Sequence, residues 1–426
     1  MSAENELIDR NTLGVLRPGP FRRFIIGSVI SDTGTWMQVT AQAYVMSTLT
    51  NKALLLGMVQ FAAGLPMLAL TMIGGSAADR FDKRRILLST QYVQIALAVA
   101  IGTLLMTGHI AIWQIFIAAS LLGISNSFEM PAISALVPEL VKHEEIASAV
   151  AIDRAVFHGS RVVGPALAGI CIRIWGAASA FFGNAISFVA LIIALISLPA
   201  RPIGTPEEEE QRGSGIKEGF RYVAKDKPSL AMIALIATTT VCIFPILTVM
   251  MPLYVKNILG LGGDRLGYLL SGSAIGSVVG SILLLRVPRD RRPTVMMVCV
   301  GMVTCAIFGL SRTSDFAVAT ALLVVNSLGL SMNFGLANTI VQERAPNYLR
   351  GRVSAVFTLS FVGLMPIAGL GITGISDLIG MRSALAIGAV IYGLIGFFVL
   401  ARVRRQCIVR PLSVVEVEPP PAVAAI

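Results

Sequence analysis

Residues 75–85 read Gly75-Ser-Ala-Ala-Asp79-Arg80-Phe-Asp-Lys83-Arg84-Arg85, and this polar segment separates two long apolar stretches. The flanking stretches, 54–78 and 86–107, each have the roughly 20 apolar residues that a helix needs to cross a bilayer core of about 30 Å. The segment between them holds four basic residues. The pattern therefore predicts two antiparallel membrane-spanning helices joined by a short basic turn at one membrane face.

The apolar pattern extends over the whole chain of 426 residues, of which 55% are hydrophobic and only 14% charged. A soluble domain has about 25% charged residues, so a soluble globular fold and a disordered chain are excluded. Twelve stretches are long enough to span a membrane: 24–48, 54–78, 86–107, 110–137, 147–173, 176–198, 229–255, 266–286, 294–311, 315–341, 353–376 and 381–402. The predicted fold class is an all-α membrane protein with twelve transmembrane helices.

The basic residues are distributed unequally between the two sides of these spans. Of the 34 lysines and arginines, 26 fall on the side of the termini and six on the other side. The positive-inside rule then places both termini in the cytoplasm of a multi-pass protein in a bacterial inner or plasma membrane. Because this charge is spread over loops without interleaved aromatic residues, we expect no nucleic-acid partner.

The two halves of the chain contain matching segments, which indicates an internal duplication. The matching pairs are Gly123–Phe128 with Gly329–Phe334, Leu56-Gly57 with Leu266-Gly267, and Pro165–Gly169 with Pro366–Gly369. The first pair is separated by 206 residues, in agreement with the span count. We therefore expect two six-helix pseudo-repeats that rock about a central site, as in alternating-access transporters.

A long hydrophilic gap between spans six and seven divides these halves. It reads as a flexible or partly amphipathic linker. The expected organisation is a cytoplasmic N-terminal segment (1–20), a first six-helix bundle (21–198), a cytoplasmic linker (199–228), a second bundle (229–402) and a cytoplasmic tail (403–426).

The basic turn resembles the signature G-x-x-x-D-[RK]-x-G-[RK]-[RK] of the major facilitator superfamily. We expect Gly75 to allow close helix packing and Asp79 to face a helix N-terminus and nearby arginines. The candidate latch that would stabilise one access state consists of Gly75, Asp79, Arg80, Lys83, Arg84 and Arg85. Asp82 stands where the signature has its second glycine, so the tight turn must be made in another way.

Further segments resemble the exporter branch of this superfamily that includes enterobactin and macrolide exporters. They are Gly34–Gln38, Met130–Leu140, Arg161–Gly169 and Ala337–Val353. The resemblance implies proton-coupled export of drug-like or siderophore-like molecules. Ile133-Ser134 departs from it, because a basic and an amide residue are expected there, so any role of that basic residue is absent.

Ionisable residues inside the spans are costly and are therefore candidates for function. Asp32 lies near the middle of span one, Glu129 inside span four and Arg161 inside span five. We expect the two acids to move protons and Arg161 to favour their release. The alternatives are a fixed ion pair between Glu129 and Arg161, and a purely structural polar role for Asp32.

Polar and aromatic residues within the spans are candidates for lining a substrate cavity: Trp36, Gln38, Gln42, Asn126, Phe128, Asn333, Phe334 and Asn338. For each one alone, helix-to-helix hydrogen bonding or packing is the competing interpretation. A broad apolar cavity with a few amides would suit amphipathic cargo.

Enzymatic chemistry has little support in this sequence. Gly369-Leu-Gly371-Ile-Thr-Gly374 fits G-x-G-x-x-G, but it lies in an apolar span with no preceding strand. No P-loop, metal-ligand spacing or nucleophile-base constellation occurs, so we expect no enzyme activity, no cofactor and no metal.

The function expected from the sequence is secondary active efflux of small amphipathic molecules, coupled to protons, by alternating access. The expected partners are a small-molecule substrate, protons and the lipid bilayer, with the chain working as a monomer. An importer or uniporter of a small metabolite is one alternative. A scaffold or sensor without transport activity, built on the same fold, is the other.

Overall fold

A computed structural model describes residues 14–198, 216–346 and 349–409, and these residues form helices and short connections. The N-terminal half contains α2 (Pro20–Leu49), α3 (Ala53–Arg80), α4 (Lys83–Met106), α5 (Ile112–Glu139), η1 (His143–Glu145), α6 (Ile146–Trp175) and α7 (Ala178–Ile196). The C-terminal half contains α8 (Ile216–Lys225), α9 (Lys227–Cys242), η3 (Ile246–Met250), α10 (Met251–Asn257), α11 (Gly263–Leu284), η4 (Arg289–Arg291), α12 (Arg292–Arg312), α13 (Phe316–Arg344), α14 (Arg350–Thr358), η6 (Leu359–Gly363), α15 (Met365–Ile379) and α16 (Met381–Val409).

The predicted spans correspond to these helices with small shifts at their ends. Eleven helical segments of the described chain are long and apolar enough to cross a membrane. Helix α2 is the twelfth long helix, and it is less apolar than these segments, with Asp32, Gln38, Gln42 and several Ser and Thr residues in its interior. Its packing against α6 and α7 places it among the other spans nonetheless. Span seven is α9, η3 and α10 in succession, and span eleven is α14, η6 and α15.

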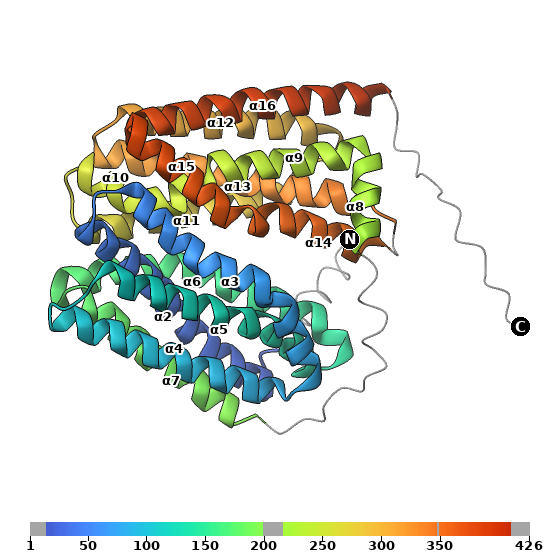
Figure 1. The fold of residues 1–426 in the computed structure, drawn as a ribbon. Coiled ribbons are helices and arrows are strands. Elements are labelled where there is room, and N and C mark those ends of the chain that lie inside the picture. The colour runs from blue at the N-terminus through green and yellow to red at the C-terminus, as the bar shows by residue number, and fades with distance from the viewer. Residues whose placement is uncertain (1–13, 199–215, 347–348, 410–426) are drawn as a thin grey trace, which may run out of the picture.

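The predicted N-terminal segment, most of the linker and most of the C-terminal tail lie outside the described residues. The described end of the linker forms α8, whose Tyr222 hydroxyl donates a hydrogen bond of 2.6 Å to the Arg344 carbonyl oxygen. The α8 helix thereby packs against the second bundle, beside α14 (Figure 1).

Polar caps start several of the helices. Asp82 Oδ1 accepts a 3.0 Å hydrogen bond from Arg84 N, so the residue that replaces the second signature glycine caps α4. Asp315 caps α13 in the same way, with Val318 N 2.8 Å from its Oδ1. Gly176 and Gly380 end α6 and α15 with φ of 81° and 86°, a left-handed conformation that glycine adopts without strain. The related helices of the two halves thus end in the same way.

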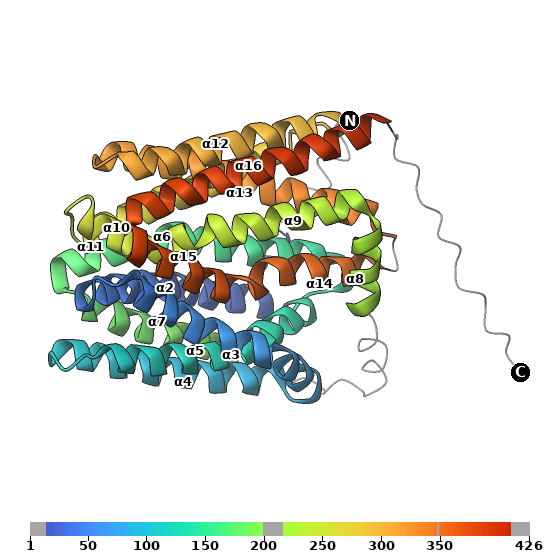
Figure 2. The same cartoon turned by 45° about the horizontal axis from the view of Figure 1, so that its top comes forward.

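The helices form two bundles side by side, one coloured blue to green and one yellow-green to red (Figures 1 and 2). In the first bundle α3 packs on α5 and α4 on α7, whereas in the second α11 packs on α13 and α12 on α16. Between the bundles α6 meets α11, and α15 meets α3. The fifth helix of each half thus contacts the second helix of the other half, which is the exchange that a pseudo-two-fold axis produces.

Small residues line both of these seams. A Cβ on Gly267 would overlap the Pro165 carbonyl oxygen, and a Cβ on Gly57 would lie 3.0 Å from the Gly369 carbonyl oxygen. Small residues let helix backbones approach this closely. The segments that match between the two halves of the sequence are therefore the segments that join the bundles, with Leu56-Gly57 against Gly369 and its counterpart Leu266-Gly267 against Pro165.

The two ends of the pair of bundles differ in their polar contacts. We call the end with the α3–α4 turn and α8 the basic end. Its described ion pairs join residues of the same half, among them Lys83 with Glu139, Arg289 and Arg292 with Glu343, Arg344 with Asp226, and Arg352 with Glu218. At the opposite end, polar contacts cross between the halves, such as Lys256 Nζ at 2.7 Å from Asn51 Oδ1. The bundles are therefore fastened to one another at the opposite end.

Candidate functional site

Glu129, on α5, is held by two amide side chains of α4. Gln91 Nε2 donates to Glu129 Oε1 over 2.7 Å, and Gln94 Nε2 donates to Oε2. Gln91 is fully buried and Gln94 is 4% exposed. The two glutamines are three residues apart, so they share one face of α4. Both oxygens of this carboxyl group are thus engaged. The glutamine pair in span three was the sequence signal for this contact, and the predicted site did not include it.

Asp32, on α2, lies within electrostatic range of two other acids. The charges of Glu129 and Asp153 both act on its carboxyl group, and each repels a negative charge there. The structure thus brings together the two acids that the sequence predicted, Asp32 and Glu129, from helices α2 and α5. It adds Asp153 of α6, whose charge also acts on Asp32.

Arg161 stacks on an aromatic ring instead of pairing with an acid. Its guanidinium carbon lies 5.3 Å from the centroid of the Trp36 ring. Gly164 makes room for this contact, since a Cβ there would lie within 2.5 Å of Trp36 Cβ. Among the described residues we find no ion pair between Arg161 and Glu129, so the fixed pair considered from the sequence is not formed in this conformation.

The other cavity candidates fall into two groups. Gln38 and Asn333 are buried and bond to neighbouring helices, with Asn184 Nδ2 2.8 Å from Gln38 Oε1 and Asn333 Nδ2 3.3 Å from Tyr392 Oη. Half-buried positions, which leave part of the side chain open, are those of Trp36, Gln42, Asn126, Phe128, Phe334 and Asn338. Gln38 and Asn333 therefore join helices within a bundle, and the second group remains available to a ligand.

Phe334 belongs to an aromatic cluster in the second bundle. Its ring centroid lies 5.2 Å from that of Phe357 and 5.1 Å from that of Phe361, and Phe361 lies 4.5 Å from Phe244. Phe361 is part of the π-helical segment η6, and Phe244 lies two residues before the π-helical segment η3. Such segments insert an extra residue into a helix turn and often occur at functional sites. Hydropathy could not reveal them.

The glycine that allows close helix packing next to the basic turn is not the one that we expected. A Cβ on Gly75 would meet nothing within 4 Å, whereas a Cβ on Gly74 would overlap the Ser127 carbonyl oxygen. The prediction that Gly75 allows close packing was wrong, because Gly74 is the glycine that faces α5. Asp79 and Arg80 each take part in an interaction.

The remaining latch residues bind within the first bundle. Lys83 Nζ lies 2.9 Å from Glu139 Oε1 at the end of α5. Arg84 donates two hydrogen bonds at the end of α7, 2.9 Å to the carbonyl oxygen of its last residue, Ile196, and 3.0 Å to that of Leu198 just beyond it. Arg85 lies 3.8 Å from Asp82. The turn between α3 and α4 therefore ties together α4, α5 and α7 of one half.

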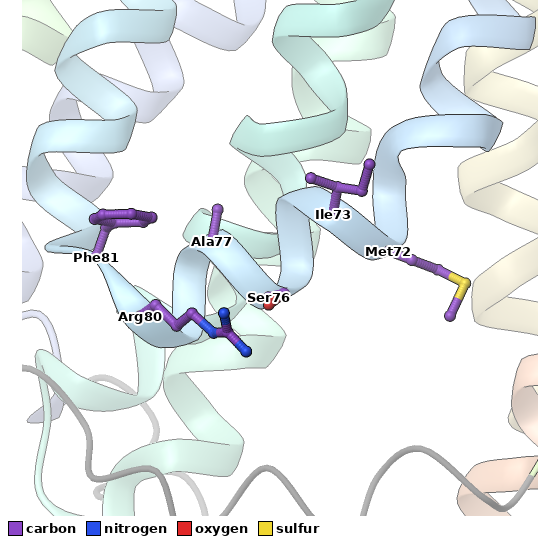
Figure 3. A pocket seen from close by; sticks show the side chains of 6 residues that line it. All are labelled: Met72, Ile73, Ser76, Ala77, Arg80 and Phe81. Atoms are coloured by element: carbon purple, nitrogen blue, oxygen red, sulfur yellow. The ribbon is translucent and has the colours of Figure 1, made fainter.

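A cavity of about 370 Å³ lies against the last turns of α3, at the basic end. Figure 3 shows its lining side chains: Met72, Ile73, Ser76, Ala77, Arg80 and Phe81. Met72 and Phe81 are 80% and 63% exposed, so this cavity opens to the outside of the bundle. Of the residues predicted to act in transport it contains only Arg80, from the latch. Within the described parts of the chain no group of three metal-ligating side chains occurs.

Comparison with known families identifies the fold that this geometry suggests. Residues 10–418 match the model of a family described as transmembrane secretion effector, within the major facilitator superfamily. The chain belongs to this family. Its members are transporters, which confirms the expectation that the protein is a major facilitator transporter and not an enzyme.

Several curated relatives are similar over nearly their full lengths. The multidrug efflux pump Tap of Mycolicibacterium fortuitum is 25% identical, with 91% of this chain and 97% of the relative covered. The staphyloferrin A transporter of Staphylococcus aureus is 23% identical, with coverage of 84% and 90%. The enterobactin exporter EntS of Shigella boydii is 23% identical, with coverage of 92% and 95%. The resemblance to an exporter branch inferred from the sequence is thereby confirmed.

Solved structures share the fold at low sequence identity. A bacterial homologue of the iron transporter ferroportin, in an inward-facing state, aligns with a TM-score of 0.67 and 16% identity over 90% of this chain and 98% of its own. The nucleoside transporter NupG aligns with a TM-score of 0.70 and 11% identity over 90% and 99%. These similarities confirm two six-helix pseudo-repeats in the major facilitator arrangement.

Proposed function

We propose that this transporter exports small amphipathic molecules in exchange for protons, by alternating access between its two bundles. The main support is the pair of acids Asp32 and Glu129 inside the first bundle. A carboxyl group that is buried among helices and bound by neutral amides can exist with or without its proton more easily than one paired with a fixed cation. Glu129 has that environment, because its partners are Gln91 and Gln94.

We further propose that the basic end faces the cytoplasm and that this conformation is open toward it. The unequal distribution of lysine and arginine supports the orientation. The polar contacts between the halves at the opposite end, such as the one between Lys256 and Asn51, support the conformation. We also retain the proposed division into bundles 21–198 and 229–402, with a cytoplasmic linker between them, and the proposal that one chain transports alone.

Drug-like and siderophore-like molecules are the proposed cargo. Relatives of this chain bear the names multidrug efflux pump, staphyloferrin A transporter and enterobactin exporter. The half-buried Trp36, Phe128 and Phe334 would provide aromatic contacts for such molecules.

Reconstitution into proteoliposomes with an imposed pH gradient tests this function. We would follow two fluorescent probes with the same apolar body, pyrenebutyrate and pyrenebutylamine, together with the internal pH. Probe movement that depends on the gradient, with opposite proton movement, is expected for the wild type. E129Q and D32N should each abolish the proton movement, whereas D290N, which removes an exposed acid of the α11–α12 turn, should leave it unchanged.

Two outcomes would favour the other functions. Probe uptake that ignores the pH gradient would support a uniporter. No flux of either probe by a folded protein, together with loss of a protein partner on mutation of Asp79, would support a scaffold or sensor.

A further inference from the structure

Helix α6 presents three basic side chains on one face. Arg154, His158 and Arg161 are spaced by four and three residues, which places them in one row along a helix. Arg154 and His158 are exposed, and Arg161 is half-buried. In the described chain no carboxylate forms an ion pair with any of them, and the charges of both arginines act on His158. This basic row is therefore a concentration of positive charge within a predicted span.

The row lies between the side of α6 that meets Trp36 of α2 and the side that meets α11 of the second bundle. Its next member, four residues on, is Pro165, whose carbonyl oxygen a Cβ on Gly267 of α11 would overlap. One residue beyond Arg161, the Val162 carbonyl oxygen accepts a 2.8 Å hydrogen bond from the Ser271 hydroxyl of α11. The contact between α6 and α11 thus begins where the basic row ends. From that contact, the basic row extends along α6 toward the basic end.

The lipid-facing side of α6 is a different row. Its large apolar side chains are spaced by four, three and four residues and are 38–59% exposed: Val163, Leu167, Ile170 and Ile174. This row is displaced by two residues from the row of His158, Arg161 and Pro165. Since each residue turns a helix by about 100°, the two rows lie on opposite sides of α6. The basic row therefore does not face lipid.

The neighbouring acids are directed elsewhere. Glu129 is engaged by Gln91 and Gln94. Asp153 precedes Arg154 by one residue, so its side chain leaves the helix about 100° away from the row. It lies on the side of α6 that meets α2, where its charge acts on Asp32. The charge of Arg154 also acts on Asp153, so this acid reduces the positive charge of the row. Within the described residues, neither acid forms an ion pair or a hydrogen bond with the donors of the row.

Arg161 is prepared to bind an anion. The Trp36 ring stacks at 5.3 Å from its guanidinium carbon, and Phe157 packs edge-on to Trp36 at 5.8 Å. Stacking fixes the plane of the guanidinium group and leaves its N–H donors at the edge. No hydrogen bond from these donors is found within the described residues. A planar donor edge next to two aromatic rings suits a carboxylate attached to an apolar body.

We propose that the basic row of Arg154, His158 and Arg161 binds the carboxylate of an anionic amphipathic cargo, whose apolar part contacts Trp36 and Phe157. This inference names the cargo class and rests on the proposed export function. Arginines within a membrane-spanning helix are costly, and an anionic ligand bound beside them would offset that cost. A negative interior potential would also drive an exported anion outward.

The test compares the two pyrene probes, which differ only in the sign of their charge. Binding to the purified protein in nanodiscs is measured by energy transfer from tryptophan to pyrene. We expect wild type to bind pyrenebutyrate at least about tenfold more tightly than pyrenebutylamine. The double variant R154Q/R161Q should lose about tenfold or more in pyrenebutyrate affinity, because each charge-assisted hydrogen bond contributes a factor of this order. Its affinity for the amine should not fall.

Matched variants separate this binding from general effects of charge. R173Q removes one positive charge in the last turn of the same helix and should change pyrenebutyrate affinity less than about twofold. R154K/R161K keeps both charges and should recover part of the lost affinity. Because the wild-type preference and the lysine variant can be measured even if the glutamine variant does not fold, the test does not depend on one protein.

Each outcome decides the proposal. Preference for pyrenebutylamine, binding of neither probe, or equal pyrenebutyrate binding by wild type and a folded R154Q/R161Q protein would overturn it. Transport of the amine alone would overturn this inference but preserve the export function. Selective binding of pyrenebutyrate without gradient-driven transport would preserve this inference and count against the export function.

Discussion

The carboxylate of Asp377, at the end of α15, caps the first turn of α3 in the other half of the molecule. Its Oδ1 lies 2.8 Å from the backbone nitrogen of Ala53, and its Oδ2 lies 2.9 Å from that of Leu54. On the other side of the α2–α3 turn, Lys256 Nζ lies 2.5 Å from the Ser47 carbonyl oxygen near the end of α2. An acid thus meets a helix N-terminus and a base meets a helix C-terminus, which is the favourable arrangement for both helix dipoles.

Removing the Asp377 cap should weaken closure at the opposite end. Loss of an N-cap costs about 0.5–2 kcal/mol, so D377A should shift the equilibrium between the two access states by roughly two- to thirtyfold toward opening at this end. Spin labels on cysteines at positions 107 and 312, one in each half, should report longer distances. D315A, which removes a cap within the second bundle, is the control and should leave the distances unchanged. Unchanged distances in D377A would show that the cap does not stabilise closure.

The two amides that bind Glu129 should stabilise the fold through that residue. Q91L leaves one oxygen of the carboxyl group without its donor and should lower the free energy of unfolding by about 1–3 kcal/mol. In an E129Q background the same change should cost less, because the partner is no longer a carboxyl group. Unfolding of the four proteins, followed by denaturant titration in detergent, gives the coupling energy of the pair. A coupling near zero would contradict the interaction between Gln91 and Glu129.

Adjacent glycines of α3 should respond differently to the same substitution. G74A places a methyl group against the Ser127 carbonyl oxygen and should destabilise the protein by about 1–3 kcal/mol through overpacking. G75A meets nothing within 4 Å and should stabilise it by up to about 1 kcal/mol, because alanine favours helix. Thermal unfolding in detergent measures both. The prediction fails if G75A is the more damaging change.

The Asp226–Arg344 contact should make the stability of the folded protein depend on pH in the acid range. Burial alone would raise the pKa of Asp226, but hydrogen bonds from Arg344 and Ser229 and the Arg344 charge hold this pKa below its ordinary value. Because the folded pKa lies below the unfolded one, the contribution is complete above about pH 4 and is lost as the pH falls through the folded pKa. Melting temperatures of wild type and D226N, measured from neutral to acid pH, should converge at the acid end. A constant difference would refute the link.

Local sequence patterns were sufficient for the fold. Each apolar stretch became helical, with spans seven and eleven interrupted by π-helical segments and with α16 continuing past its predicted end, since about 20 apolar residues have few alternatives to a spanning helix. The matched glycines of the repeats also proved informative. Leu56-Gly57 and Leu266-Gly267 lie at the two seams between bundles, because only small residues permit such close approach.

Sequence patterns did not predict the interaction partners of individual polar residues. Gly74 and Gly75 look alike in the sequence, and only the direction in which α5 lies distinguishes them. Similarly, the candidate ion pair between Glu129 and Arg161 was replaced by amides around the acid and a Trp36 ring beside the base. Side-chain partners depend on how helices are rotated about their axes, and a pattern of hydropathy leaves that rotation open.

The sequence by itself determined the class of the protein: its spans, its duplication and, through the charged loops, the expected orientation. Each of these is a property of one segment or a sum over segments. Only the tertiary structure decided that Asp377 caps a helix of the other half and that Arg161 stacks on Trp36 instead of pairing with an acid. Such contacts join residues from distant parts of the chain, and their geometry exists only once the helices have packed.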